Sequence, residues 1–156
     1  MKIEIKSRLN ESIIFEGDFS CIAEAVKSAI KNSANLRYAN LCYADLRYTN
    51  LSHADLSYAN LSHANLGFTN LSHANLSYGR ITTNGRPFIQ ISPLGEDKRQ
   101  LMAFNTNKGI CLTTGCFTGS ISEFKTALKA KHGTNLIAKE YLLAVDLIEN
   151  HFNLWK

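Results

Sequence analysis

The sequence predicts a mainly β protein with a short solenoid at its centre, and three observations lead to this prediction. Residues 34–78 form nine consecutive five-residue units with no break in register. A second, longer period of four units runs through these repeats, and the sequences on either side lack both periods. We therefore expect three parts, which are a β-hairpin and capping helix (residues 1–33), the repeat solenoid (34–83) and an α+β cap with strands followed by two helices (84–156).

The five-residue unit itself indicates a coiling chain. Leu stands at the centre of each unit, Ala or Thr stands two residues earlier, and Asn or Asp lies between them. A period of five fits neither an amphipathic helix nor a long strand. The small residue and the Leu point to the same side of a short extended segment, so the other residues must turn the chain. Such coils have to stack in order to bury the leucines and pair their backbone groups.

The longer period indicates the number of sides in each coil. Thr49 and Thr69 replace Ala at positions four units apart, and His53 and His73 have the same separation. Tyrosine also recurs at this spacing, at Tyr38, Tyr58 and Tyr78. Four sides per coil would stack these like residues, although a ten-residue duplication would leave similar traces.

These units resemble the pentapeptide repeat family, whose members form a right-handed, four-sided (quadrilateral) β-helix. The resemblance implies that the central leucines fill the core, at Leu36, Leu41, Leu46, Leu51, Leu56, Leu61, Leu66, Leu71 and Leu76. It also implies an outward position near the corners for Tyr38, Tyr43, Tyr48, His53, Tyr58, His63, Phe68, His73 and Tyr78.

Length and composition indicate a hydrophobic core of ordinary size, and the cysteines indicate a reducing compartment. The chain has 156 residues, 45% of them apolar, and has neither an apolar run of about 18 residues nor a signal-peptide pattern. We therefore expect a cytoplasmic protein without a membrane span. The cysteines lack the spacing of a disulfide framework, and they stand at Cys21, Cys42, Cys111 and Cys116.

The segment before the repeats predicts a cover for the first coil. Lys2–Lys6 and Ser12–Glu16 read as the strands of a hairpin. Ser20 is the predicted N-cap of a helix from Cys21 to about Asn32. A covering element of this kind protects the apolar end and the unpaired strand edges of a solenoid.

The segment after the repeats predicts a β-β-α-α cap on the far end of the solenoid. Asn84-Gly85 is a hairpin signal, and 100–105 and 109–114 read as further strands. Ser120 and Glu123 form a predicted capping box that opens a helix to about Lys131. Thr134 is then expected to cap a second helix over 135–152.

The flanks resemble those of pentapeptide repeat proteins from bacteriophages and prophages. The residues that carry this resemblance lie at 2–6 and 15–18 before the repeats, and at 103–106 and 115–119 after them.

The sequence offers little support for catalysis, a cofactor or a metal. No nucleophile, zinc-protease, phosphate-loop or dinucleotide motif is present. His53 and His73 would stack within reach of one metal, but zinc normally takes three or four protein ligands and His63 would project elsewhere. Cys111 and Cys116 lack the spacing of a zinc or redox motif. We expect no enzyme, no cofactor and no metal site.

Net charge is +4, and the surplus lies after residue 78, where ten basic residues face six acidic ones. This surplus supports an alternative function, nucleic-acid binding through phosphate contacts. Its candidate residues are Arg80, Arg86, Lys98, Arg99 and Lys108. A helix-turn-helix interpretation of the last two helices is disfavoured, because the second helix carries more acidic than basic residues.

Some pentapeptide repeat proteins imitate duplex DNA and act on type II topoisomerases. That mechanism requires a long acidic rod, whereas these repeats form only about two coils whose charges sum to zero. The leading hypothesis is instead a non-enzymatic phage or prophage accessory protein, a rigid platform that binds a host or viral protein through its outward Tyr, His and Phe residues. Exposed end strands or the apolar final helix with Trp155 would support a homodimer, and a cap that buries them is the alternative.

Overall fold

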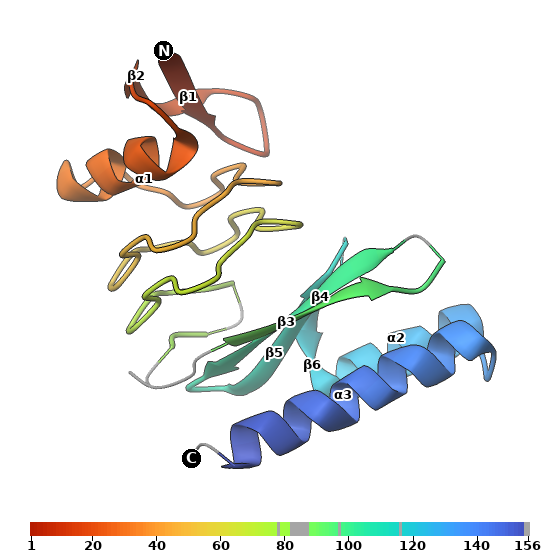
Figure 1. The fold of residues 1–156 in the computed structure, drawn as a ribbon. Helices are drawn as coiled ribbons and strands as arrows, with labels where there is room; N and C mark the ends of the chain where they lie inside the picture. Colours follow the sequence, from red (N-terminus) through yellow and green to blue (C-terminus); the bar gives the residue numbers. More distant parts are fainter. Residues whose placement is uncertain (78, 82–87, 97, 116, 155–156) are drawn as a thin grey trace. The chain divides into compact units, whose positions relative to one another are not determined.

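The computed structural model shows two compact units, residues 1–81 and residues 82–156 (Figure 1). It describes residues 1–77, 79–81, 88–96, 98–115 and 117–154.

The first unit begins with the expected hairpin and helix. Strand β1 (Lys2–Lys6) pairs antiparallel with β2 (Ile13–Asp18). Helix α1 (Ile22–Lys31) contacts both strands through a face that includes Ala25, Val26 and Ala29, all fully buried. The predicted Ser20 cap is wrong by one residue. Cys21 is the N-cap and makes no side-chain capping bond, while Ser20 Oγ donates to Glu24 Oε2 at 2.7 Å.

The hairpin continues directly onto the first coil of the repeats. Ser7 forms an antiparallel bridge with Ala39. Arg8 N–H donates to the Tyr38 carbonyl at 2.8 Å, and Asn40 N–H donates to the Lys6 carbonyl at 2.7 Å. The strand edge of the first coil is therefore paired, as a covering element requires.

The repeats contribute single-residue bridges rather than strands. Parallel bridges join equivalent positions four units apart, namely Asn40 to Asn60, Asp45 to Asn65, Asn50 to Asn70 and Asp55 to Asn75. All nine central leucines are buried, with at most 9% of their surface exposed. The bridges therefore place equivalent residues of units four apart next to each other.

The second unit is a four-stranded antiparallel sheet with two helices on one face (Figure 1). The sheet order is β3 (Phe88–Leu94), β4 (Arg99–Thr106), β5 (Gly109–Thr114) and β6 (Phe117–Ser120). Helices α2 (Ile121–His132) and α3 (Leu136–Leu154) follow. Leu101 and Leu112 from the sheet share a core with Phe124 on α2 and Val145 on α3.

The structure corrects two predictions in this unit and confirms one. The described strands of this unit number four, so the β-β-α-α order was wrong. The two extra strands are β3, which precedes the expected pair, and β6, which has only four residues and carries no periodic signal. Asn135, not Thr134, caps α3, since its Oδ1 accepts the Ala138 N–H at 2.9 Å. The Ser120–Glu123 capping box is confirmed. The Asn84-Gly85 hairpin signal lies outside the described residues.

Taken together, the two antiparallel sheets, the bridged repeats and the three helices agree with a mainly β fold. Across the described ranges, no helix has the length and apolar content needed to cross a membrane.

Candidate interaction surface on the repeat corners

The corner residues, defined as those two positions after each central leucine, have left-handed backbone. Their φ angles lie between 56° and 62° at Tyr38, Tyr43, Tyr48, His53, Tyr58, His63, Phe68 and His73. The next residue closes a turn, as where Ala39 N–H donates to the Leu36 carbonyl at 3.1 Å. A positive φ at this place in a turn ordinarily selects Gly or Asn, so these bulky residues are held by their surroundings. Tyr78 lies outside the described residues.

Hydrogen bonds between coils hold the corners in place. His53 N–H donates to the Ser72 carbonyl at 3.0 Å, and Tyr38 N–H donates to the Ser57 carbonyl at 3.0 Å. Within a unit, the residue before Leu accepts from the backbone two positions later, as Asn50 Oδ1 does from Ser52 N–H at 3.0 Å. This side-chain turn explains why the position is Asn or Asp in every unit.

The rings of corner residues four units apart stack on one another. Tyr38 stacks on Tyr58 with ring centroids 5.0 Å apart and an interplanar angle of 10°. The other stacks are Tyr43 on His63 (4.8 Å, 7°), Tyr48 on Phe68 (5.0 Å, 2°) and His53 on His73 (5.0 Å, 21°). The described repeats therefore carry four stacks, whose ring separation follows the spacing of adjacent strands.

Several stacked rings are open to solvent although they are large and apolar. Phe68 is 81% exposed, Tyr43 74% and Tyr48 68%. Tyr58 is less exposed, and Tyr38 and His63 are half-buried. The most exposed rings lie on the Tyr43–His63 and Tyr48–Phe68 stacks, which belong to successive corners of the same coils.

The charged residues of the repeats are paired with one another. Arg47 donates twice to Asp45, from Nε at 2.8 Å and from Nη2 at 2.6 Å. Arg37 Nη1 lies 3.4 Å from Asp55 Oδ2. The guanidinium carbon of Arg37 also lies 5.5 Å from the centre of the Tyr58 ring, within cation–π range.

These pairs act on the carboxylates. Hydrogen bonds from Arg47 lower the pKa of Asp45 below its ordinary value. Burial by itself raises the pKa of Asp55, but hydrogen bonds from Ser57 and the Arg37 guanidinium outweigh it, and the net shift is downward. Both carboxylates are therefore ionised at neutral pH, and the repeat surface has local ion pairs but no net charge.

The two stacked histidines do not belong to a larger ligand cluster. The part of the chain that the structure describes contains no group of three or more His, Cys, Asp or Glu residues placed to hold a metal ion. The His53 and His73 imidazoles contact each other through their ring faces.

The candidate phosphate-binding residues are spread over both units. Arg80 belongs to the first unit, where its Nε donates to Asn75 Oδ1 at 3.0 Å. Arg99 is the first residue of β4 and Lys98 directly precedes it, whereas Lys108 follows the end of the strand, roughly 25 Å away at the rise of a strand. Arg86 lies outside the described residues. Clustering on one face stays a prediction.

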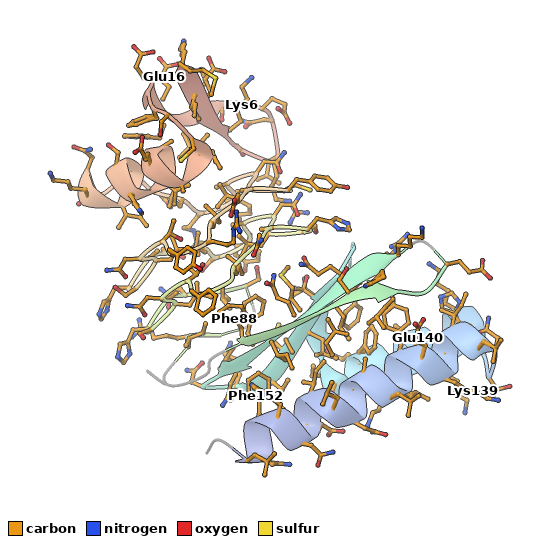
Figure 2. All side chains as sticks on the ribbon, viewed as in Figure 1. Lys6, Glu16, Phe88, Lys139, Glu140 and Phe152 are labelled. Atoms are coloured by element: carbon orange, nitrogen blue, oxygen red, sulfur yellow. The ribbon has the colours of Figure 1, made fainter. Side chains whose placement is uncertain are left out.

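The two final helices form a packed hairpin. Lys125 Nζ on α2 lies 3.4 Å from Glu149 Oε2 on α3. One face of α3 is buried, with Tyr141, Val145, Ile148 and Phe152 at most 5% exposed. Figure 2 shows Glu140 and Phe152 towards opposite ends of this helix.

Sequence reasoning missed an exposed leucine stripe on α3. Leu136, Leu143, Leu147 and Leu154 are 54–80% exposed. Their spacing of 7, 4 and 7 residues places them on one face of a helix, opposite the buried one. The sequence contains that spacing, but the apolar pattern of the buried face of α3 is longer and is the stronger signal.

Comparison with known proteins identifies the repeats. Residues 34–77 match the family model described as Pentapeptide repeats, in eight copies. No curated protein and no solved structure matches the chain. The segment that carries the corner residues is thus a pentapeptide repeat segment.

Proposed function

We propose that the repeats are a rigid platform that binds a protein through the exposed stacked rings at their corners. The observation that carries this proposal is the pair of stacks formed by Tyr43 with His63 and Tyr48 with Phe68. Three of these four rings are at least 68% exposed while their backbone is fixed by hydrogen bonds between coils.

The physical reason is the low entropic cost of using these rings. A free side chain loses roughly 0.5–1.5 kcal/mol of rotamer freedom when an interface immobilises it. Rings that already stack on one another have lost part of that freedom on folding. Tyrosine also offers a large apolar face together with a hydroxyl group, which is why it is common in recognition surfaces.

The charge pattern favours a protein over a nucleic acid as the partner of this surface. Arg37 and Arg47 are each paired with an aspartate, and phosphate contacts would have to compete with those pairs. The charges of the repeats sum to zero, so the surface has no net attraction for a polyanion. Nucleic-acid binding through Lys98, Arg99 and Lys108 in the second unit remains the alternative.

Bridges between equivalent positions four units apart, together with the ring stacks, support a quadrilateral β-helix. The resemblance to pentapeptide repeat proteins supports a right-handed one. The phage-like flanks support a non-enzymatic phage or prophage accessory protein that meets a host or viral partner in the bacterial cytoplasm.

The experiment compares capture by two matched triple variants. The first variant (the ring variant) replaces Tyr43, Tyr48 and Phe68 by Ser. The second (the leucine variant) makes the same change at Leu136, Leu143 and Leu147, which are comparably exposed apolar residues on α3. Each tagged protein is incubated with bacterial lysate, with and without nuclease treatment, and bound proteins are quantified by mass spectrometry. Circular dichroism establishes that each variant is folded.

We expect a discrete protein that the wild type and the leucine variant retain and the ring variant loses. Equal capture by all three proteins would contradict a role for the rings. Loss with the leucine variant alone would place the interaction on α3, and loss of all bound material after nuclease would favour nucleic-acid binding.

A further inference from the structure

The second unit contains a cavity of about 500 Å³ between the sheet and the two helices. It is lined by turns that precede β4 and β6, by α2 and by the start of α3. This volume lies within the range of small-molecule sites, about 300–1,000 Å³. It is also separate from the repeat surface, since every lining residue belongs to the second unit.

The cavity has an apolar floor built largely from aromatic rings. Phe124 contacts Phe117 and Tyr141 edge to face, with ring centroids 5.2 and 5.7 Å away. Leu94, Leu128 and Ile137 complete the apolar lining. A ligand body that fits this floor is a hydrocarbon chain or ring, because a polar group here would lose its hydration without compensation.

Charged side chains line the same cavity. Among the described residues, Arg99 and Lys131 are the positive ones and Glu96 is the carboxylate, and the imidazole of His132 lies beside them. The Arg99 guanidinium packs over Gly115, where an added Cβ would lie 2.5 Å from Nη1. Guanidinium groups in general bind carboxylates through charge-assisted hydrogen bonds.

Basic residues in the last turn of a helix also interact favourably with the helix dipole, so Lys131 and His132 alone would not indicate a ligand. Thr114 supplies an independent observation. Its Oγ1 is shielded from solvent and has no hydrogen-bond partner among the described residues. Thr114 lines the same cavity, and a buried hydroxyl without a partner loses free energy that a ligand oxygen would restore.

Residues of α3 hold the turn at Gly95, which lines the cavity. Gly95 N–H donates to Glu140 Oε2 at 2.7 Å. Gly95 has a φ of +68°, and an added Cβ would meet the Tyr141 ring at 3.4 Å. The turn that carries Glu96 is therefore anchored to α3, which gives the cavity a preformed wall.

We propose that this cavity binds a small amphipathic monocarboxylate, with its hydrocarbon part on the aromatic floor and its carboxylate among Arg99, Lys131 and Thr114. A single negative charge opposite Arg99 and Lys131, with Glu96 as the carboxylate among the described lining residues, gains attraction overall.

The test is a titration of the ¹⁵N-labelled full-length protein with sodium octanoate, followed by two-dimensional NMR. We expect saturable shifts at residues that line the cavity. Octanol has the same chain without the charge and should bind at least tenfold more weakly, a difference of about 1.4 kcal/mol. Absence of saturable shifts, or equal binding of octanol and octanoate, would overturn the proposal.

Two matched pairs of variants locate the site on α2. Lys131→Gln should weaken octanoate binding several-fold without affecting octanol, whereas Lys129→Gln, on the same helix but not at the cavity, should change neither. Ala127→Trp should block both ligands because exposed Ala127 lines the cavity, and Ala130→Trp should not. An unchanged affinity in Lys131→Gln or Ala127→Trp would reject the site.

The direction of the change in octanoate affinity in one further variant distinguishes recognition of the carboxylate charge from a general apolar effect. Glu96→Gln removes the carboxylate at the cavity, and octanoate should then bind more tightly by a few-fold while octanol is unaffected. Weaker octanoate binding in this variant would contradict the assigned role of the basic residues.

Discussion

Thr49 and Thr69, at equivalent positions of successive coils, donate their buried hydroxyl groups to the same acceptor, the carbonyl oxygen of Leu46. The Oγ1 to oxygen distances are 2.5 Å for Thr49 and 2.7 Å for Thr69. Both residues stand where the other units have Ala, and both are at most 6% exposed. The two hydroxyls thus link repeat units that stand four units apart in the sequence.

Replacing these threonines by valine should destabilise the repeats. Valine preserves the volume and removes the hydroxyl, so Thr69→Val should lower the free energy of unfolding by about 1 kcal/mol. The Leu46 carbonyl also accepts Thr49 N–H at 3.2 Å and is not left unpaired. Since the two hydroxyls compete for one oxygen, we expect the double variant to lose more than the sum of the single variants.

The measurement is urea unfolding monitored by far-UV circular dichroism. Thr134→Val provides the control, because Thr134 is exposed, and it should leave stability unchanged within about 0.5 kcal/mol. Single valine variants as stable as the wild type would show that the shared acceptor contributes nothing.

Substitutions at Tyr48 should differ in stability according to how well the new residue tolerates a positive φ. Tyr48 has a φ of 56°, a region that Asn enters readily and β-branched residues avoid. Tyr48→Asn and Tyr48→Val both remove the stack on Phe68, so their difference isolates the backbone conformation. We expect the valine variant to be less stable by about 1–2 kcal/mol, as measured by chemical unfolding.

The same pair of substitutions at Ser52 supplies the comparison. Ser52 lies one residue before a corner and does not have a positive φ. Valine there should be at least as stable as asparagine. A similar valine penalty at both positions would attribute the effect to side-chain type and not to the left-handed corner.

The repeats show what the sequence can predict and where it fails. Leucine burial follows from a period that only stacked coils can satisfy, and the partner of each corner ring follows from the return of the chain after four units. The left-handed φ of Tyr48 was not predictable, because intrinsic preference opposes it and only hydrogen bonds between coils impose it. The shared acceptor of Thr49 and Thr69 was equally hidden, since it depends on a backbone atom.

The second unit was less predictable because its signals are short or depend on tertiary contacts. The Ser120–Glu123 capping box is a local hydrogen-bond pattern and was read correctly. Strand β6 is four residues long and was missed. The cavity was also not predictable, since it joins residues from 94 to 141 that come together only in the fold.

The capping box should make the stability of the second unit depend on pH. Glu123 Oε2 accepts from Ser120 Oγ at 2.6 Å and from Ser120 N–H at 2.7 Å. These hydrogen bonds lower the pKa of Glu123 from its ordinary value of 4.5. A carboxylate with a lowered folded pKa stabilises fully above about pH 4.5, and its contribution is lost as pH falls through the folded pKa.

Comparison with Glu123→Gln isolates this contribution from the other carboxylates. The wild type should be more stable than the variant at pH 7, and the difference should shrink between pH 5 and pH 3. Urea unfolding at pH 7, 5 and 3 measures it. A difference that stays constant over this range would show that the Glu123 charge does not contribute to the cap.

The cysteines should differ sharply in reactivity. Burial raises the pKa of the Cys111 thiol to about 12, and the residue is 2% exposed. Cys21 is exposed and Cys42 is intermediate. Because the thiolate is the reactive form, iodoacetamide at pH 8 should label Cys21 first, Cys42 more slowly and Cys111 only when the protein unfolds. Peptide mass spectrometry over time reads each site separately, and labelling in urea supplies the unfolded reference. Rapid labelling of Cys111 in the native protein would mean that β5 opens to solvent far more often than a buried core strand should.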